Sequence, residues 1–111
     1  DCVDFSYGNY TIDKLNLSDC GDKALSVGEK SKLYLNKINA NSALIGVASK
    51  DSSMVELENV NFNLVGTCLS AYKKKQEFNG GIIKVNKMNC NYLNEKTQFD
   101  KYSLIKGLNK L

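Results

Sequence analysis

The sequence contains no histidine, tryptophan, proline or arginine, and all fifteen of its positive charges are lysines. Without histidine, the chain lacks the commonest general base and the commonest ligand of transition metals. Without arginine, it lacks the side chain that holds carboxylates and phosphates with two parallel hydrogen bonds. These absences argue against catalysis within this segment, although aspartate, glutamate, lysine and tyrosine remain.

Long apolar runs and a strong charge imbalance are also missing. No run approaches the about 20 apolar residues that span a bilayer, so we expect no membrane span. The net charge is +3 and the isoelectric point is about 8.6, whereas nucleic-acid-binding domains usually exceed about 9. We therefore expect no nucleic-acid partner. The chain starts with Asp1 and shows no signal peptide, so we expect it to be processed or cut from a longer protein.

The four cysteines are Cys2, Cys20, Cys68 and Cys90, and none forms a Cys-x-x-Cys pair. This spacing makes a zinc site a weak interpretation. Cys20 and Cys90 occupy apolar positions of the repeat described next, where cysteine acts as a small hydrophobic residue. We expect four free structural thiols. The alternative is a disulfide between Cys2 and Cys20, if they stack on neighbouring coils.

One seven-residue pattern occurs four times, and it reads apolar, Asp/Asn/Glu, Lys/Asn, apolar, Asn, apolar, Asn/Ser. Its copies begin at Ile12, Leu35, Leu57 and Val85, so the steps are 23, 22 and 28 residues. These steps indicate a repeat array with one insertion. A second element, an apolar–small–apolar triplet, lies out of phase with the first, at residues 5–7, 25–27, 45–47 and 69–71.

Each repeat holds three short alternating segments separated by polar turns, which is a strand pattern. Three strands and about 22 residues per turn, without a helix, predict an all-β fold: a right-handed parallel β-helix of four to five coils. Stacking should place Leu35 over Ile12 and under Leu57, because a single coil cannot bury its own apolar edge. The predicted coils are 1–11 (partial), 12–34, 35–56, 57–84 with a loop at 73–81, 85–107, and 108–111 (partial).

The C-terminal stretch, residues 93–111, has two interpretations. Apolar residues every third position permit a short capping helix, whereas Leu108 to Leu111 restart the repeat 23 residues after Val85. We prefer a fifth coil. Both ends would then expose unpaired strand edges, which predicts end-to-end self-association.

The asparagine columns also have two interpretations. Asn16, Asn39, Asn61 and Asn89 lie between inward residues and should point outward. We favour a structural side-chain ladder between coils. The alternative is a surface that binds sugar hydroxyls.

The insertion must leave the coil as a loop, and loops on a rigid scaffold often carry function. Its candidate ligand-binding residues, which could hold an anionic polymer, are Tyr72, Lys73, Lys74, Lys75 and Phe78. The alternative, which we favour, is a solvated charge run.

With both repeats in view, residues 1–93 resemble the right-handed parallel β-helix of the pectin-lyase-like superfamily. Residues 1–6 and 20–31 are similar to segments of large bacterial surface or secreted proteins. The resemblance implies polysaccharide binding or cleavage. Lyases of that superfamily use a calcium site and an arginine base, and this chain has no arginine, so calcium is only a weak possibility and we expect no cofactor.

Hydrolases of the superfamily pair aspartates on adjacent coils, which makes Asp4 and Asp22 weak catalytic candidates, and turn formation is the favoured role for both. We therefore expect a non-catalytic carbohydrate-binding or surface-display module, extracellular or at the cell surface. The alternatives are part of a polysaccharide hydrolase or lyase whose remaining site lies on other coils, and a structural spacer.

Overall fold

The computed structural model describes residues 1–107, and its regular structure there is entirely β-strand. The strands are β1 (Val3–Ser6), β2 (Asn9–Gly28), β3 (Lys32–Lys50), β4 (Met54–Tyr72), β5 (Ile82–Phe99) and β6 (Leu104–Gly107). They form one sheet in chain order, and every neighbouring pair is parallel. Consecutive parallel neighbours require a full turn of chain between them. The predicted parallel β-helix is therefore confirmed, and no helix within residues 1–107 could cross a membrane.

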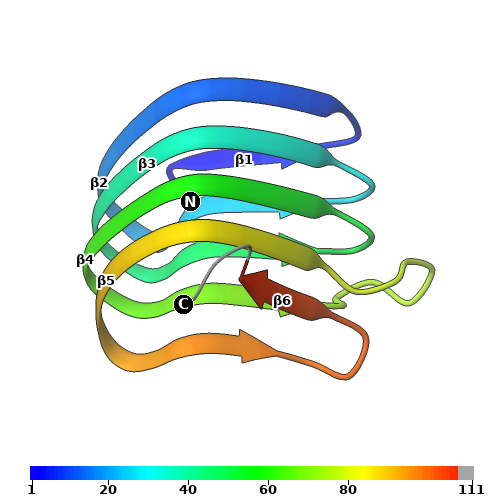
Figure 1. Cartoon of the computed structure of the whole chain (residues 1–111). Coiled ribbons are helices and arrows are strands. Elements are labelled where there is room, and N and C mark those ends of the chain that lie inside the picture. The colour runs from blue at the N-terminus through cyan, green and yellow to red at the C-terminus, as the bar shows by residue number, and fades with distance from the viewer. Residues whose placement is uncertain (108–111) are drawn as a thin grey trace.

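Each long strand arches over one side of the molecule, bends at one margin and returns underneath (Figure 1). We call the two parts of a coil the outgoing half and the return half. Strands of 18 to 20 residues run through the bend unbroken, so each coil is one curved strand rather than the three short strands expected. At the bend, Asp19, Gly21, Ser42 and Leu64 adopt positive φ, which redirects the chain while the ladder continues on both sides.

The outgoing halves stack as the repeat predicts. Leu35 pairs with Ile12 on one side and with Leu57 on the other, and Leu57 pairs with Val85. Leu35, Leu57 and Val85 are completely buried between the two halves. The other two predicted inward columns are also confirmed, and they are Leu15/Ile38/Val60/Met88 and Leu17/Ala40/Phe62/Cys90.

The return halves stack in a different register from the one predicted. The triplet 25–27 pairs with 3–5 and 47–49, and 47–49 pairs with 69–71, so the copies expected at 5–7 and 45–47 are wrong by two residues. At 3–5 the cause is Asp4, which is not a small residue, and at 47–49 it is Ser49, a polar residue at an inward position. The Ser49 hydroxyl lies 2.7 Å from the Ser53 hydroxyl and 3.0 Å from the Ile82 carbonyl oxygen. A search for apolar residues overlooks such a position.

Buried serines fix the turns at the opposite margin. Ser31 Oγ donates to the Gly28 carbonyl at 2.6 Å, and Ser53 Oγ donates to the Val27 carbonyl at 3.0 Å. In the next coil Gly81 follows the insertion, and a Cβ there would lie 1.9 Å from the Ser49 carbonyl oxygen. The two serines satisfy backbone carbonyls where the ladder is interrupted, and Gly81 allows the chain to pass close to β3.

The insertion leaves the coil between β4 and β5 as predicted, and pairing resumes with Ile82 beside Met54 (Figure 1). Residues 93–107 continue the solenoid and contain no helix, which confirms the coil interpretation for this part. Val85 pairs with Gly107, one residue earlier than the alignment with Leu108 predicted. The rest of that restart and the partial coil 108–111 lie outside the described residues, and self-association stays a prediction.

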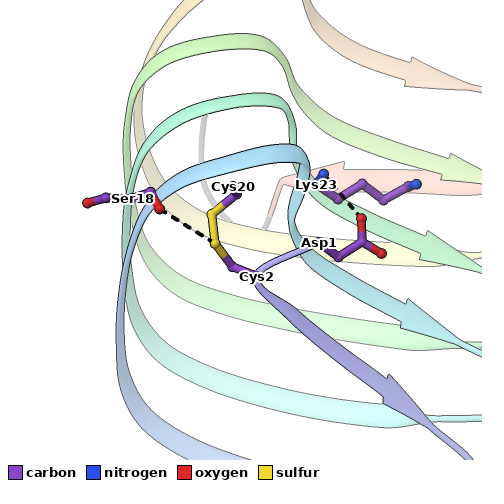
Figure 2. Close-up of a disulfide and its surroundings, with 5 residues drawn as sticks. All are labelled: Asp1, Cys2, Ser18, Cys20 and Lys23. Atoms are coloured by element: carbon purple, nitrogen blue, oxygen red, sulfur yellow. Dashed lines mark hydrogen bonds between the residues drawn. A yellow bond between two sulfur atoms is a disulfide. The ribbon is translucent and has the colours of Figure 1, made fainter.

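All four cysteines form disulfides, so the prediction of free thiols is wrong. Cys2 bonds to Cys20 with a Cα separation of 5.0 Å, which confirms the alternative pairing (Figure 2). Cys68 bonds to Cys90 with a Cα separation of 6.4 Å. The second pair was not foreseen because its cysteines lie on opposite halves of neighbouring coils, and the solenoid brings them together across the core.

Candidate functional site

A groove crosses the outer face of the return halves and has a cavity volume of about 380 Å³. We call it the return-face groove. Its lining residues are Lys23, Ile45, Ser70, Ala71, Tyr72, Gln98, Phe99 and Asp100. They come from β2, β3, β4, β5 and the turn after β5, so the site exists only when successive coils are stacked.

Strand alternation explains the shape of the groove. Leu25, Val47 and Leu69 form an inward column in the core, so the next residue of each strand points outward. That outward column consists of Asp4, Ser26, Ala48, Ser70 and Gln98. Ser26, Ala48 and Ser70 have small side chains, and Ser70 forms a low part of the groove between longer neighbours such as Tyr72.

Three lysine charges act on one another in this region. A hydrogen bond to Asp22, with Nζ 2.7 Å from Oδ2, raises the pKa of Lys23, and the same contact lowers the pKa of Asp22. Burial lowers the pKa of Lys50, and the positive charges of Lys23 and Lys74 lower it further. The charges of Asp4 and Asp51 oppose this shift without reversing it.

Tyr72 gives the groove an aromatic wall. Its side chain is half-buried, and burial raises the pKa of its hydroxyl, which therefore stays neutral at physiological pH. The groove thus combines the Lys23 ammonium, the Asp100 carboxylate, a neutral phenol, the Ser70 hydroxyl and the apolar surfaces of Ile45 and Phe99. The positive charges of Lys50 and Lys23 act on each other beside it. Such a mixture suits a ligand that is anionic and also has apolar C–H surface.

The structure separates the predicted loop lysines. The Lys73 ammonium lies 4.6 Å from the ring centroid of Tyr102, and the Lys75 ammonium forms an ion pair with Glu29. Lys74 is exposed, and its charge acts on Lys50. Phe78 is half-buried within the loop, where its N–H donates to the Lys75 carbonyl at 3.2 Å. Of the five predicted ligand-binding residues, only Tyr72 lines the groove.

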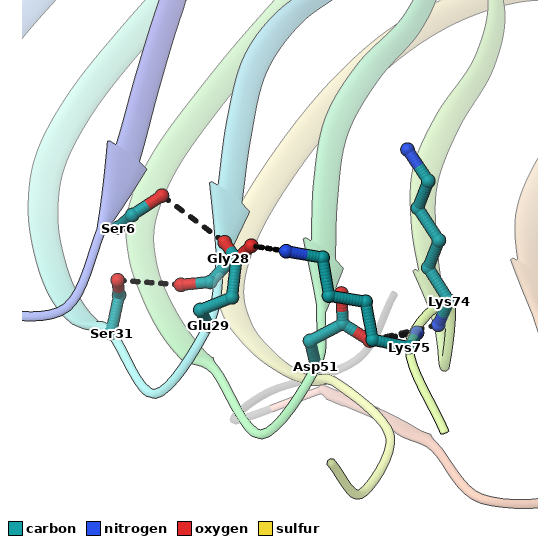
Figure 3. Close-up of polar contacts among 7 residues, drawn as sticks. All are labelled: Ser6, Gly28, Glu29, Ser31, Asp51, Lys74 and Lys75. Atoms are coloured by element: carbon teal, nitrogen blue, oxygen red, sulfur yellow. Dashed lines mark hydrogen bonds and ion pairs between the residues drawn. The ribbon is translucent and has the colours of Figure 1, made fainter. Parts of the chain in front are cut away.

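Two carboxylates hold the start of the loop (Figure 3). Asp51 is completely buried, and its Oδ1 accepts the backbone N–H groups of Lys74 and Lys75, both at 2.8 Å. Glu29 accepts a hydrogen bond from Ser6 Oγ at 3.1 Å and pairs with the Lys75 ammonium. The loop therefore leaves the coil at a fixed position beside the groove.

The weak catalytic candidates Asp4 and Asp22 lie on neighbouring coils, and the charges of both act on Lys23. Asp22 is held ionised by its bond to Lys23, which lowers its pKa. A general acid needs a pKa near the working pH. Asp22 therefore forms a structural ion pair and has no proton to donate as a general acid.

The asparagine columns carry hydrogen bonds between coils. Asn39 Nδ2 donates to Asn16 Oδ1 at 2.8 Å, and Asn91 Nδ2 donates to Asn63 Oδ1 at 3.3 Å. These bonds support the interpretation as a side-chain ladder. A shallower groove of about 210 Å³ lies between the two outward columns, and sugar binding there stays a prediction.

Sequence reasoning missed Lys23, Ser26, Lys50 and Asp51. Their grouping depends on the register of the return halves, which was predicted with a two-residue error. Within the described chain, no group of three or more Asp, Glu or Cys side chains is placed to hold a metal ion. Comparisons with protein-family models, with curated proteins and with solved structures find no match, so the case for a function rests on the groove itself.

Proposed function

We propose that this chain is a non-catalytic carbohydrate-binding module of an exported protein, and that it holds an acidic polysaccharide in the return-face groove. The observation that carries the proposal is that the Lys23 ammonium and half-buried Tyr72 line one groove, with Lys50 near enough for its charge and that of Lys23 to act on each other. Partial burial removes water from Lys50, and its like-charged neighbours destabilise its charged form. A carboxylate of the ligand would offset both effects.

The repeat of the solenoid suits a polymer. Neighbouring coils are spaced by about 4.8 Å, so a chain laid across the strands meets a new set of side chains at each coil. The lining changes from Lys23 on β2 to Tyr72 on β4 and Gln98 on β5. Two disulfides are typical of an oxidising compartment, which supports export to the cell surface or beyond.

Affinity electrophoresis tests the proposal. The protein would be run through native gels that contain either a polyuronate or a neutral glucan, with and without calcium. We expect retardation by the polyuronate only, unchanged by calcium and reduced at least fivefold in apparent affinity by Lys50→Gln. Lys37→Gln is the matched control, because it makes the same charge change at an exposed position on the outgoing half.

Two outcomes would contradict the proposal. Equal retardation of both lysine variants would mean that net charge, not the groove, holds the polymer. No retardation in any gel would leave a structural spacer as the better account of this segment.

A further inference from the structure

Ser26 carries one of two buried side-chain polar atoms without a hydrogen-bond partner in residues 1–107. The residue is completely buried, and its Oγ bonds to nothing. A buried hydroxyl without a partner costs stability, whereas alanine at the same position would not. The other such atom, Asp51 Oδ2, belongs to a carboxylate whose second oxygen already holds the insertion loop. Ser26 has no comparable structural role.

The hydroxyl lies in the same outward column as Ser70, which lines the return-face groove. Ser26 pairs with Ala48, and Ala48 pairs with Ser70, which lines the groove. All three occupy the outward column, so Ser26 Oγ points to the outer face and lies two strands away from Ser70. The column of small side chains therefore runs from the groove to Ser26 and ends at the Asp4 carboxylate on β1.

A flexible side chain lies beside Ser26 on the outer face. The next outward residue of the same strand is Gly28, which leaves a recess. The Lys50 stem occupies it: Cε and Cγ lie 3.2 and 3.6 Å from the point where a Cβ on Gly28 would stand. A lysine stem has four rotatable bonds, and moving it out opens the recess without disturbing the ladder.

We propose that Ser26 is a ligand-binding residue and that the Lys50 side chain moves aside to admit the ligand. One uronate ring displaces the Lys50 stem, and the carboxylate of that ring pairs with the Lys50 ammonium. A hydroxyl of the same ring forms a hydrogen bond with Ser26 Oγ. A uronate carries a carboxylate and several hydroxyls on one ring, so it presents both groups to adjacent residues of the outer face. This inference rests on the proposed function and names the groups of the ligand that the protein recognises.

Calorimetric titration of a hexuronate oligosaccharide tests this role. We expect Ser26→Ala to weaken binding about threefold to tenfold, as the loss of one hydrogen bond does, while the unfolding temperature stays unchanged or rises. Ser18→Ala, at an exposed position of the outgoing half, is the matched control and should change neither quantity. Wild-type affinity in Ser26→Ala would overturn the inference while leaving the proposed function intact.

The acetylated oligosaccharide separates binding from stability. Acetylation blocks the ring hydroxyls. It should therefore lower the affinity of the wild type for the oligosaccharide by a larger factor than it lowers the affinity of Ser26→Ala. An equal effect of acetylation on both proteins would overturn the role of Ser26, even if Ser26→Ala unfolds more easily. Failure of the wild type to bind any oligouronide would instead count against the proposed function itself.

Discussion

At the turn between β3 and β4, the Asp51 carboxylate replaces backbone hydrogen bonds that the insertion loop loses when it leaves the coil. Asp51 itself has a φ of 54°, a conformation that residues other than glycine and asparagine adopt at a cost. Replacing Asp51 would therefore change both the hydrogen bonds to the loop and the backbone strain. Asp19 allows the two effects to be separated. Asp19 has the same φ of 54° but is exposed.

Asp51→Ala should lower the free energy of unfolding by about 1–3 kcal/mol more than Asp19→Ala does, because it removes the acceptor of two partly buried N–H groups and the anchor of the loop. Urea denaturation of both variants measures the difference. Asp19→Ala carries the backbone strain alone and serves as the control. Equal losses would show that the carboxylate does not anchor the loop.

The ion pair of Glu29 predicts a dependence of stability on pH. The hydrogen bond from Lys75 holds the pKa of Glu29 below its ordinary value of 4.5, and Ser6 adds to the effect. A depressed carboxylate pKa means that the native state binds protons less readily than the unfolded state. The stabilisation is therefore complete above pH 4.5 and is lost as the pH falls through the lower native-state pKa.

Thermal unfolding of the wild type and of Glu29→Gln between pH 6 and pH 3 measures this effect. The wild type should unfold at a higher temperature near pH 6, and the difference should shrink toward pH 3. Parallel curves would contradict the assignment. Asp22 and Asp100, whose pKa values are also lowered, should contribute a remaining acid dependence to both proteins.

Among the strands, Gly46 on β3 shows how closely the return half of one coil approaches β4 in the next coil. A Cβ at this position would lie 2.4 Å from the Phe62 ring and 2.6 Å from the Cys68 carbonyl oxygen. Gly46→Ala should therefore destabilise the protein by about 1–3 kcal/mol through overpacking. Gly28→Ala is the control, since its nearest neighbour is the flexible Lys50 stem. Chemical denaturation measures the free energy of unfolding of both variants. Equal stability of the two would contradict the packing described.

The same strands show what the sequence can and cannot predict. The outgoing halves were placed correctly because Ile12, Leu35 and Leu57 repeat an apolar pattern that stacking must preserve. On the return halves, the triplet at 47–49 was misplaced by two residues because Ser49 satisfies its hydroxyl internally and resembles a surface residue. Lys23, Lys50 and Tyr72 lie on these halves, so their convergence could not be read before the register was known.

For the molecule as a whole, the Cys68–Cys90 disulfide joins the return half of one coil to the outgoing half of the next and spans the insertion. Removing it with Cys68→Ala and Cys90→Ala should lower the free energy of unfolding by about 2–4 kcal/mol, mainly by freeing the unfolded chain. Removing Cys2–Cys20 should cost slightly less, because its sequence separation is 18 residues rather than 22 and it restricts the unfolded chain less. Denaturant unfolding of the two double variants compares them. A larger loss for the terminal pair would contradict this account.

The central claim is that the return-face groove recognises the carboxylates of an acidic glycan. The most direct measurement is calorimetric titration of the wild type with a hexuronate oligosaccharide and with its methyl ester, which keeps the sugar chain and removes the charge. We predict saturable binding of the acid and at least tenfold weaker binding of the ester. Equal affinity for the two, or no binding of the acid, would contradict the claim.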